Sequence, residues 1–346
     1  MNVRNAGIPN MHLREFFLAL LCLGASNCWA APLFEDNSVL EVTLTGPFGS
    51  LLDSLEDRAE LPFVLEAQGI RHEIEVRVRG NSRLRVCNFP PLRLNFRGEL
   101  TKQTVFEGQN KLKLVTHCRN YDRGEQDMLE EFAAYRIMNV LSDNSYRVRL
   151  LRINYRDTDG KLSDKAALRY GFLLEDDSQL ATRIGAQAAV LEGVPKKRHH
   201  VDQAALVYVY QYLIANTDWG LVKADYDKGC CHNIDLFELD GRVLVVPFDF
   251  DLAGLVNARY AFPDKLLRIR KVTQRLYRGL CTDRELLRAA IRRVRDSESE
   301  ILATVRETPG LSKDNAEKAT RFLGAFFRAA ENEDKLISKF ERRCIG

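Results

Sequence analysis

Alternating apolar and polar positions predict a β-rich first part of the chain. Four stretches alternate with a period of two, at residues 39–44, 74–78, 92–96 and 111–115. In the last of these, the two lysines face away from the leucines. Turns that contain glycine separate the stretches, at residues 46–49, 79–82 and 97–98. The pattern from 39 to 115 therefore predicts a small antiparallel sheet.

The spacing of apolar residues becomes helical after residue 122. Residues 122–142 predict one long helix, with Glu130 and Glu131 on its early turns. Two strands follow and end at the acidic run Glu175-Asp176-Asp177. These strands span 146–154 and 166–174, and helices are expected over 199–215, 264–279, 283–308 and 312–341. The order of elements predicts an α+β fold.

A hairpin lies in the middle of the helical part. Asp240-Gly241 is a strong hairpin turn between the apolar runs 234–237 and 243–246. Folding it back brings Asn233 and Asp249, which flank the two strands, close together. Asn216, Thr217 and Asp218 directly follow the preceding helix. Carboxylate and amide oxygens of this kind suit Mg²⁺ or Mn²⁺, which hold phosphates.

This region resembles the CotH-type spore-coat protein kinase family. The resemblance is carried by five stretches, namely Asn216-Thr217-Asp218, Asn233, Phe248-Asp249-Phe250-Asp251, Arg79-Gly80-Asn81-Ser82 and Phe172-Leu-Leu-Glu175. It implies a two-lobed protein-kinase-like fold. A β-rich N-lobe with one long helix would span residues 31–178. A mostly helical C-lobe with the catalytic loop and the metal-binding segment would span residues 179–346.

The resemblance also implies roles for these residues. Asp218 would accept or orient the proton of the acceptor hydroxyl, and ATP would be bound with Mg²⁺ or Mn²⁺. The metal ligands would be Asn233, Asp249 and Asp251. Asp225 and Asp227 are nearer to Asn233 in the chain, but Asp218 has the place of the family motif directly after the helix.

The family has a lysine just before the strand that here begins at Pro91, where this chain has Phe89 and Pro90. The cation that contacts the phosphates is therefore expected elsewhere, and Arg93 and Lys113 are the candidates. Glu130 or Glu131 would pair with that cation, and the helical period does not choose between them. Gly80 and Glu175 are further candidates for nucleotide binding.

Residues 1–30 predict a secretory signal peptide, with Arg4 and Arg14 before an apolar core and cleavage after Ala30. We therefore expect a periplasmic or secreted protein. Later stretches are not apolar enough for a transmembrane helix. The formal net charge is only +3 on 346 residues, so the composition does not indicate binding to nucleic acid.

Six cysteines follow the predicted cleavage site, and in an exported protein an even number favours disulfides. Cys87 and Cys118 lie in the same predicted lobe and could pair. Cys230 and Cys231 are neighbours, so each is expected to pair with a distant partner, Cys281 or Cys344. A metal site of Cys230, Cys231 and His232 ranks below disulfides, because it lacks a second ligand pair at zinc spacing.

Three functions remain open from the sequence. The first is an exported kinase that transfers phosphate from a metal–nucleotide complex to a protein or another hydroxyl acceptor. The second is a nucleotidyl transferase on the same fold. The third is a pseudokinase-like structural or binding protein without catalysis. The complete set of acidic and amide residues favours catalysis, whereas the missing lysine and the export signal favour the third function.

Overall fold

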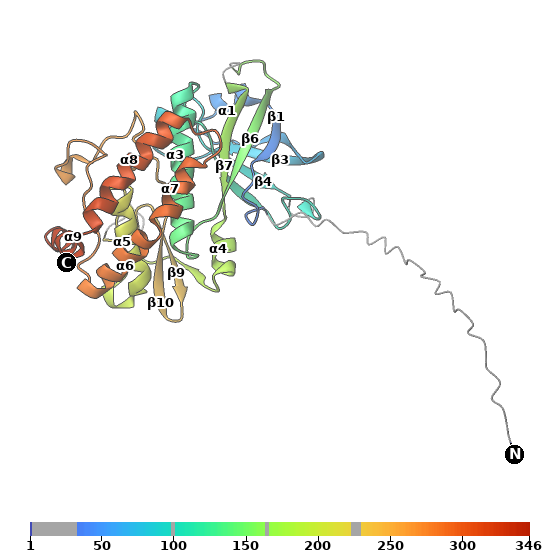
Figure 1. Ribbon diagram of the computed structural model, residues 1–346. Coiled ribbons are helices and arrows are strands. Elements are labelled where there is room, and N and C mark those ends of the chain that lie inside the picture. Colours follow the sequence, from blue (N-terminus) through green and yellow to red (C-terminus); the bar gives the residue numbers. More distant parts are fainter. Residues whose placement is uncertain (2–32, 98–100, 163–165, 223–229) are drawn as a thin grey trace.

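The computed structural model describes Met1 and residues 33–97, 101–162, 166–222 and 230–346. The expected signal peptide, apart from Met1, and the alternative residues Asp225 and Asp227 lie outside the described residues. Within the described chain, a β-rich first part is followed by a mostly helical second part (Figure 1). The α+β organisation expected from the sequence is confirmed.

The first part is a closed seven-stranded barrel with the strand order β1-β2-β3-β4-β5-β7-β6. Neighbouring strands are antiparallel except β1 and β6, whose parallel pairing closes the barrel. The sequence predicted a small antiparallel sheet without its closure into a barrel, and it did not indicate β2, where the outward-facing Val64 obscures the period of two. The strands are β1 (Leu40–Gly46), β2 (Leu61–Ala67), β3 (Ile70–Val78), β4 (Leu92–Phe96), β5 (Lys111–Val115), β6 (Val148–Asp157) and β7 (Leu168–Leu174).

Alternate residues of these strands form the barrel core. Leu94 and Leu112 are paired across β4 and β5 and point inward, where both are fully buried. Their neighbours Arg93 and Lys113 are also paired and point outward. The period of two thus places a hydrophobic core inside the barrel and a row of cationic side chains on its outer face.

Helix α3 (Asp122–Leu141) lies between the barrel and the helical part (Figure 1). It packs on β7 and β6 on one side and on α7 on the other. Apolar residues therefore occur on most of its circumference, including the fully buried Leu129 and Ile137. Both parts of the molecule therefore contact this one helix.

The second part contains a three-stranded sheet among helices. Helix α5 is buried along nearly its whole length and packs on β10. The hairpin forms at the predicted Asp240-Gly241 turn, and β8 adds to its edge. The elements of this part are α4 (Asp177–Arg183), β8 (Gln187–Ala189), the 3₁₀ turn η3 (Lys196–Arg198), α5 (Val201–Leu213), β9 (Ile234–Leu239), β10 (Arg242–Pro247), the 3₁₀ turn η4 (Lys265–Leu267), α6 (Arg284–Asp296), α7 (Glu298–Arg306), α8 (Lys313–Ala330) and α9 (Glu333–Glu341). The first part also contains two short helices, α1 (Phe48–Asp53) and α2 (Arg83–Val86).

Three helix predictions are wrong in their extent. The helix expected over 264–279 is an irregular segment with only the turn η4, which ends at Arg268 in a left-handed conformation. The expected helix over 283–308 divides at Ser297 into α6 and α7, and that over 312–341 divides at Glu331 and Asn332 into α8 and α9. The buried apolar residues keep one helical spacing across each of these two breaks, from Val294 to Ile301 and from Ala330 to Ile337, so periodicity alone does not reveal where the helix divides.

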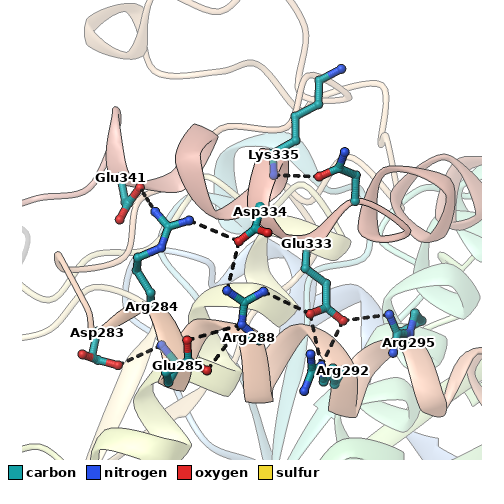
Figure 2. A network of polar contacts seen from close by, with 11 residues as sticks. Asp283, Arg284, Glu285, Arg288, Arg292, Arg295, Glu333, Asp334, Lys335 and Glu341 are labelled. Atoms are coloured by element: carbon teal, nitrogen blue, oxygen red, sulfur yellow. Dashed lines mark hydrogen bonds and ion pairs between the residues drawn. The ribbon is translucent and has the colours of Figure 1, made fainter.

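Helices α6 and α9 are joined by a network of ion pairs (Figure 2). The carboxylate of Glu333 contacts Arg288, Arg292 and Arg295 at 3.3, 3.0 and 2.8 Å. Asp334 contacts Arg288 at 3.0 Å. Hydrogen bonds from the arginines, that of Arg292 first, lower the pKa of Glu333. The arginine-rich face of α6 therefore has a structural partner inside the chain.

The six cysteines of the described residues form three disulfides, of which one was predicted. Cys87–Cys118 is confirmed. The expected pairing of Cys230 and Cys231 with Cys281 and Cys344 is wrong, because Cys230 bonds to Cys231 and Cys281 bonds to Cys344. The Cys281–Cys344 bond lies beside α6 and α9, where Leu280 and Ile345 form a β-bridge. Among the described residues, no helix is long and apolar enough to cross a bilayer.

The Cys281–Cys344 bond should stabilise the fold more than the Cys230–Cys231 bond. Its ends are 63 residues apart in the chain, so it restricts the unfolded state, whereas a bond between neighbours closes no chain loop. We expect the double variant C281S/C344S to lose up to about 4 kcal/mol of unfolding free energy in urea. The control C230S/C231S should lose much less. Equal losses in the two variants would contradict this assignment.

Candidate functional site

A small pocket, with a cavity volume of about 50 Å³, lies between the outer face of the barrel and the open end of the β9–β10 hairpin. It contains residues from both parts of the molecule. The polar and charged lining comes from Arg79, Asn81, Ser82, Arg83, Lys113, Glu131, Tyr135 and Asp249. Carboxylate, hydroxyl and cationic groups from distant stretches of the sequence thus meet in one place.

The hairpin register places the second-part residues at the pocket. Ile234 pairs with Pro247, so Asn233 and Phe248 follow at the open end, where the Phe248 amide donates to the Asn233 carbonyl at 3.2 Å. Asn233 and Asp249 both have positive φ, at 51° and 60°, a conformation that Asn and Asp tolerate better than most residues. The hairpin therefore brings the backbone at Asn233 close to the segment that carries Asp249, as the sequence predicted.

Phe250 orients the two aspartates on either side of it. Its ring is fully buried and packs 4.6 Å from the ring of Tyr135 on α3 and 5.5 Å from that of Tyr210 on α5. The Tyr135 hydroxyl accepts a hydrogen bond from the Asp249 amide at 2.8 Å. With Phe250 held in the core, Asp249 and Asp251 both reach the guanidinium of Arg83.

Arg83 is the centre of the charged cluster. Its Nη2 atom lies 2.7 Å from Glu131 Oε1 and 2.6 Å from Asp249 Oδ1, and its Nε atom lies 3.0 Å from Asp251 Oδ2. The Arg83 side chain is 7% exposed, whereas that of Asp249 is 42% exposed. One guanidinium from the barrel therefore binds α3 and the segment after β10 at once.

Burial and charge act against each other in this cluster. Burial alone would lower the pKa of Arg83, but Asp251, Glu131 and Asp249 hold it well above its ordinary value. Burial raises the pKa of Glu131 and of Asp251, and Arg83 opposes both shifts. The cluster is therefore stable as a charged group only while the guanidinium is present.

Asp218 lies in a second polar group with Asn233 and His232. Asn233 Nδ2 donates to the Asp218 carbonyl at 2.7 Å and to Asp218 Oδ2 at 3.0 Å, and His232 Nε2 lies 2.9 Å from Asp218 Oδ1. The Asp218 amide donates to Asn216 Oδ1 at 2.9 Å, and Trp219 packs beneath, stacked on Tyr208. These bonds fix Asp218 on a loop whose other residues are buried.

The two candidate cations of the barrel have different surroundings. Lys113 lines the pocket, and its Nζ atom lies 2.6 Å from Asp177 Oδ1, just past β7. Arg93 is the cross-strand neighbour of Lys113 on the same outer face, with Arg77 next in the row, but it does not line the pocket. Among the described residues, the cation that pairs with Glu131 is Arg83 rather than either of these.

The remaining predicted residues separate into two groups. Gly80 lines the pocket with a φ of 97°, which favours glycine there. Glu130 faces away from Arg83 and contacts Arg123 at 3.0 Å. Glu175 accepts hydrogen bonds from the Arg147 amide and from Arg183, at 3.0 Å and 2.8 Å, so it braces the chain after β7.

Sequence reasoning missed Arg83 and Tyr135, and it considered His232 only as a ligand in a metal site with Cys230 and Cys231. Arg83 directly follows the Arg79-Gly80-Asn81-Ser82 stretch that the sequence analysis singled out, so its position was a usable signal. Tyr135 lies four residues after Glu131 and therefore shares its helix face. For His232, its place before Asn233 gave no independent indication of contact with Asp218.

The donor set fits a divalent cation in part. Asn233 uses its nitrogen toward Asp218, and no hydrogen bond to its Oδ1 occurs among the described residues. Arg83 contacts one oxygen of Asp249 and one of Asp251, which leaves the second oxygen of each for another ligand. No cluster of three or more His, Cys, Asp or Glu side chains at metal-binding distances occurs in the described part of the chain. A cation here would use amide and carboxylate oxygens together, as Mg²⁺ accepts.

No protein-family model and no curated protein matches this sequence. Among solved structures, the chain is similar to the Helicobacter pylori proinflammatory kinase CtkA, with a TM-score of 0.35 and 13% sequence identity. The match covers 82% of this chain and 90% of that one. Because a TM-score of 0.35 does not establish a common fold, the interpretation of the site rests on its own geometry.

Removing the Arg83 guanidinium should destabilise the fold strongly. Arg83→Met would leave three carboxylates close together, two of them buried, so we expect a loss of about 3–5 kcal/mol at pH 8. The loss should be smaller at pH 5, because burial has raised the pKa of Glu131 and Asp251 and protonation then removes their charge. Urea unfolding at both pH values measures this.

Arg85→Met is the matched control for this experiment. Arg85 belongs to the same short helix, α2, and its side chain is exposed. This variant should unfold within about 0.5 kcal/mol of the unmodified protein at both pH values. If Arg83→Met also stays within that range, Arg83 does not hold the cluster together.

Proposed function

We propose that the protein is an exported, kinase-like phosphotransferase that binds ATP with Mg²⁺ or Mn²⁺ and phosphorylates a hydroxyl-bearing acceptor, most simply a protein. One observation carries the proposal: Lys113, Glu131 and Asp249 line one pocket between a β-barrel part and a helical part. Asp218 and Asn233 are hydrogen-bonded to each other at the hairpin that also delivers Asp249. This set combines cations for phosphate, oxygens for a metal and a carboxylate for the acceptor.

In this proposal, the barrel binds the phosphates. Lys113 would provide one cation, and Arg83, which lines the pocket and contacts Glu131, would provide another. Gly80 would let the backbone approach a phosphate closely, since a side chain is disfavoured at its φ of 97°. Asp249, Asp251 and Asn233 would hold the divalent cation, which neutralises charge on the transferred phosphoryl group.

Asp218 would act on the acceptor. Its carboxylate, held by Asn233 Nδ2 and His232 Nε2, would take the proton of the acceptor hydroxyl as the oxygen bonds to the γ-phosphorus and ADP leaves. The side chain is 36% exposed, so an acceptor can reach it from solvent. The family relationship to CotH-type kinases is part of this proposal.

The arrangement also favours a second candidate function, a binding protein without catalysis. Arg83 Nη2 and Nε bind the two aspartates that would hold the metal. If the guanidinium stays bound to both aspartates, they cannot bind a metal and only stabilise the fold. Nucleotide binding with and without a divalent cation separates the two candidates.

The three disulfides support the proposed export, because such bonds persist in oxidising compartments. A donor other than ATP is tested by the same binding assay with GTP and UTP.

Metal–nucleotide should raise the melting temperature of the mature chain. We expect ATP with Mn²⁺ or Mg²⁺ to stabilise the protein by about 2.7 kcal/mol at a ligand concentration of 100 times Kd, and ATP with a chelator to do much less. Asp249→Asn should abolish the metal-dependent part, because it removes a ligand charge while keeping the side-chain shape.

Asp240→Asn is the matched control, since it makes the same change at the exposed turn of the same hairpin. It should keep the full metal-dependent shift. The proposed metal site is wrong if Asp249→Asn retains the shift, and the non-catalytic function is favoured if the unmodified protein shows no shift at all.

Asp218→Asn should separate binding from transfer. We expect nucleotide binding to remain nearly unchanged and phosphate transfer from labelled ATP to fall by about 10²–10⁴-fold, because a general base acts in the chemical step. Transfer is measured on the protein itself and on a hydroxyl-rich test protein. Full activity in Asp218→Asn would place the base elsewhere.

A further inference from the structure

The segment of residues 259–271 begins and ends beside the candidate site. At its start, the Tyr260 hydroxyl donates to Asp251 Oδ2 at 3.1 Å. At its end, the chain passes so close to Gly254 that a Cβ atom there would lie 2.5 Å from the Val272 carbonyl oxygen. Gly254 in turn donates to the Ala215 carbonyl, directly before Asn216. The segment is therefore a loop anchored to both the metal-ligand and the catalytic-base candidates.

The loop has a defined shape without regular structure. Its only helical part is the turn η4, in which Asp264 accepts a hydrogen bond from the Leu266 amide at 2.8 Å. Gln274 accepts hydrogen bonds from the Arg270 and Lys271 amides at 2.5 and 3.1 Å. Side chains thus satisfy its backbone locally, and the outer side chains need not pack against the body of the protein.

Two large apolar side chains on this loop are exposed. Phe262 is 78% exposed and Leu266 is 85% exposed. Single exposed apolar residues are common on protein surfaces, but two on one short loop beside a candidate active site are a candidate contact for a partner.

The loop also has a strong excess of positive charge. It carries five cationic side chains, Arg259, Lys265, Arg268, Arg270 and Lys271, and one acidic side chain, Asp264, although the whole chain of 346 residues has a formal net charge of only +3. All five cations are exposed, and none forms an ion pair with a carboxylate of the described residues. By contrast, the arginines of α6 are paired with α9 (Figure 2). Arg259 lies over the ring of Tyr121, so the charge available to a partner is that of the other four cations.

Arg278 connects the loop to the catalytic-base candidate. It donates a hydrogen bond to the Thr217 carbonyl, one residue before Asp218. Burial lowers the pKa of Arg278, and Asp218 and Asp264 both oppose this shift. The acidic residue of the loop and the proposed base thus lie within electrostatic reach of the same guanidinium.

We infer that the acceptor is an acidic polypeptide segment with an apolar side chain near its hydroxyl, and that the 259–271 segment docks it beside Asp218. This inference rests on the proposed function for the transfer step, but the docking itself needs no nucleotide. Carboxylates of the acceptor would pair with the unpaired cations, and its apolar side chain would cover Phe262 and Leu266. Electrostatic complementarity of this kind selects partners and speeds their association.

The inference is tested by binding in the absence of nucleotide. The probe is a fluorescein-labelled peptide with one Ser, five Glu and two Leu residues, and fluorescence anisotropy with the full mature chain measures Kd. A peptide with Lys in place of Glu is the probe control. We expect the acidic peptide to bind at least tenfold more tightly than the basic one, and its affinity to fall as NaCl rises from 50 to 200 mM.

Two loop variants and one matched control complete the test. K265E/R268E and F262S/L266S should each weaken binding of the acidic peptide about tenfold or more. K313E/K335E makes the same charge change at exposed first-turn positions of α8 and α9, where a glutamate is well tolerated, and should stay within about twofold. Melting temperatures of all three variants should match the unmodified protein, because the changed side chains are exposed.

The possible outcomes are distinct. No binding of the acidic peptide, or equal loss in the control variant, overturns the inference. Sedimentation with phosphatidylserine vesicles that K265E/R268E abolishes, without peptide binding, would instead make the loop a membrane contact and also overturn it. Because peptide binding and the metal–nucleotide shift are measured separately, a protein that docks the peptide but binds no ATP would refute the proposed function alone.

Discussion

The guanidinium of Arg83 neutralises three carboxylates that come from two other segments of the chain. Glu131 belongs to α3, whereas Asp249 and Asp251 follow the β9–β10 hairpin, and all three contact Arg83 within 3.0 Å. Two of these carboxylates are almost fully buried, and unpaired charges there would be costly. Where the barrel meets the helical part, the buried negative charges of Glu131 and Asp251 are therefore neutralised by Arg83.

Helix α3 provides the scaffold for that cluster. Glu131 and Tyr135 are four residues apart and face the pocket, whereas Glu130 and Asp127 face Arg123 on another side of the helix. Phe250 packs on Tyr135, so the same helix positions both aspartates through an apolar contact. A small rotation of α3 would change the contacts of Glu131 and Asp249 together, which couples the barrel to the hairpin.

The chain uses its many charged residues in two different ways. On α6 and α9, arginines and carboxylates are paired with each other, and the pairing supports the packing of helices that the Cys281–Cys344 bond also joins. In the 259–271 segment, the cations have no such partners among the described residues, and apolar side chains lie between them. This contrast, rather than the nearly neutral total, distinguishes a structural surface from one that is available to a partner.

The sequence by itself determined the elements whose signal is local. Alternation in 92–96 and 111–115 gave β4 and β5 with their correct bounds, and Asp240-Gly241 gave the hairpin that carries Asn233 and Asp249. Only the tertiary structure decided the contacts between distant segments. The closure of the barrel by parallel β1 and β6, the choice of Glu131 over Glu130 as partner of the pocket cation, and the pairing of Cys230 with Cys231 are of this kind. Local periodicity fixes which side chains share a face, but the face that meets Arg83 is fixed by how α3 packs between the two parts of the molecule.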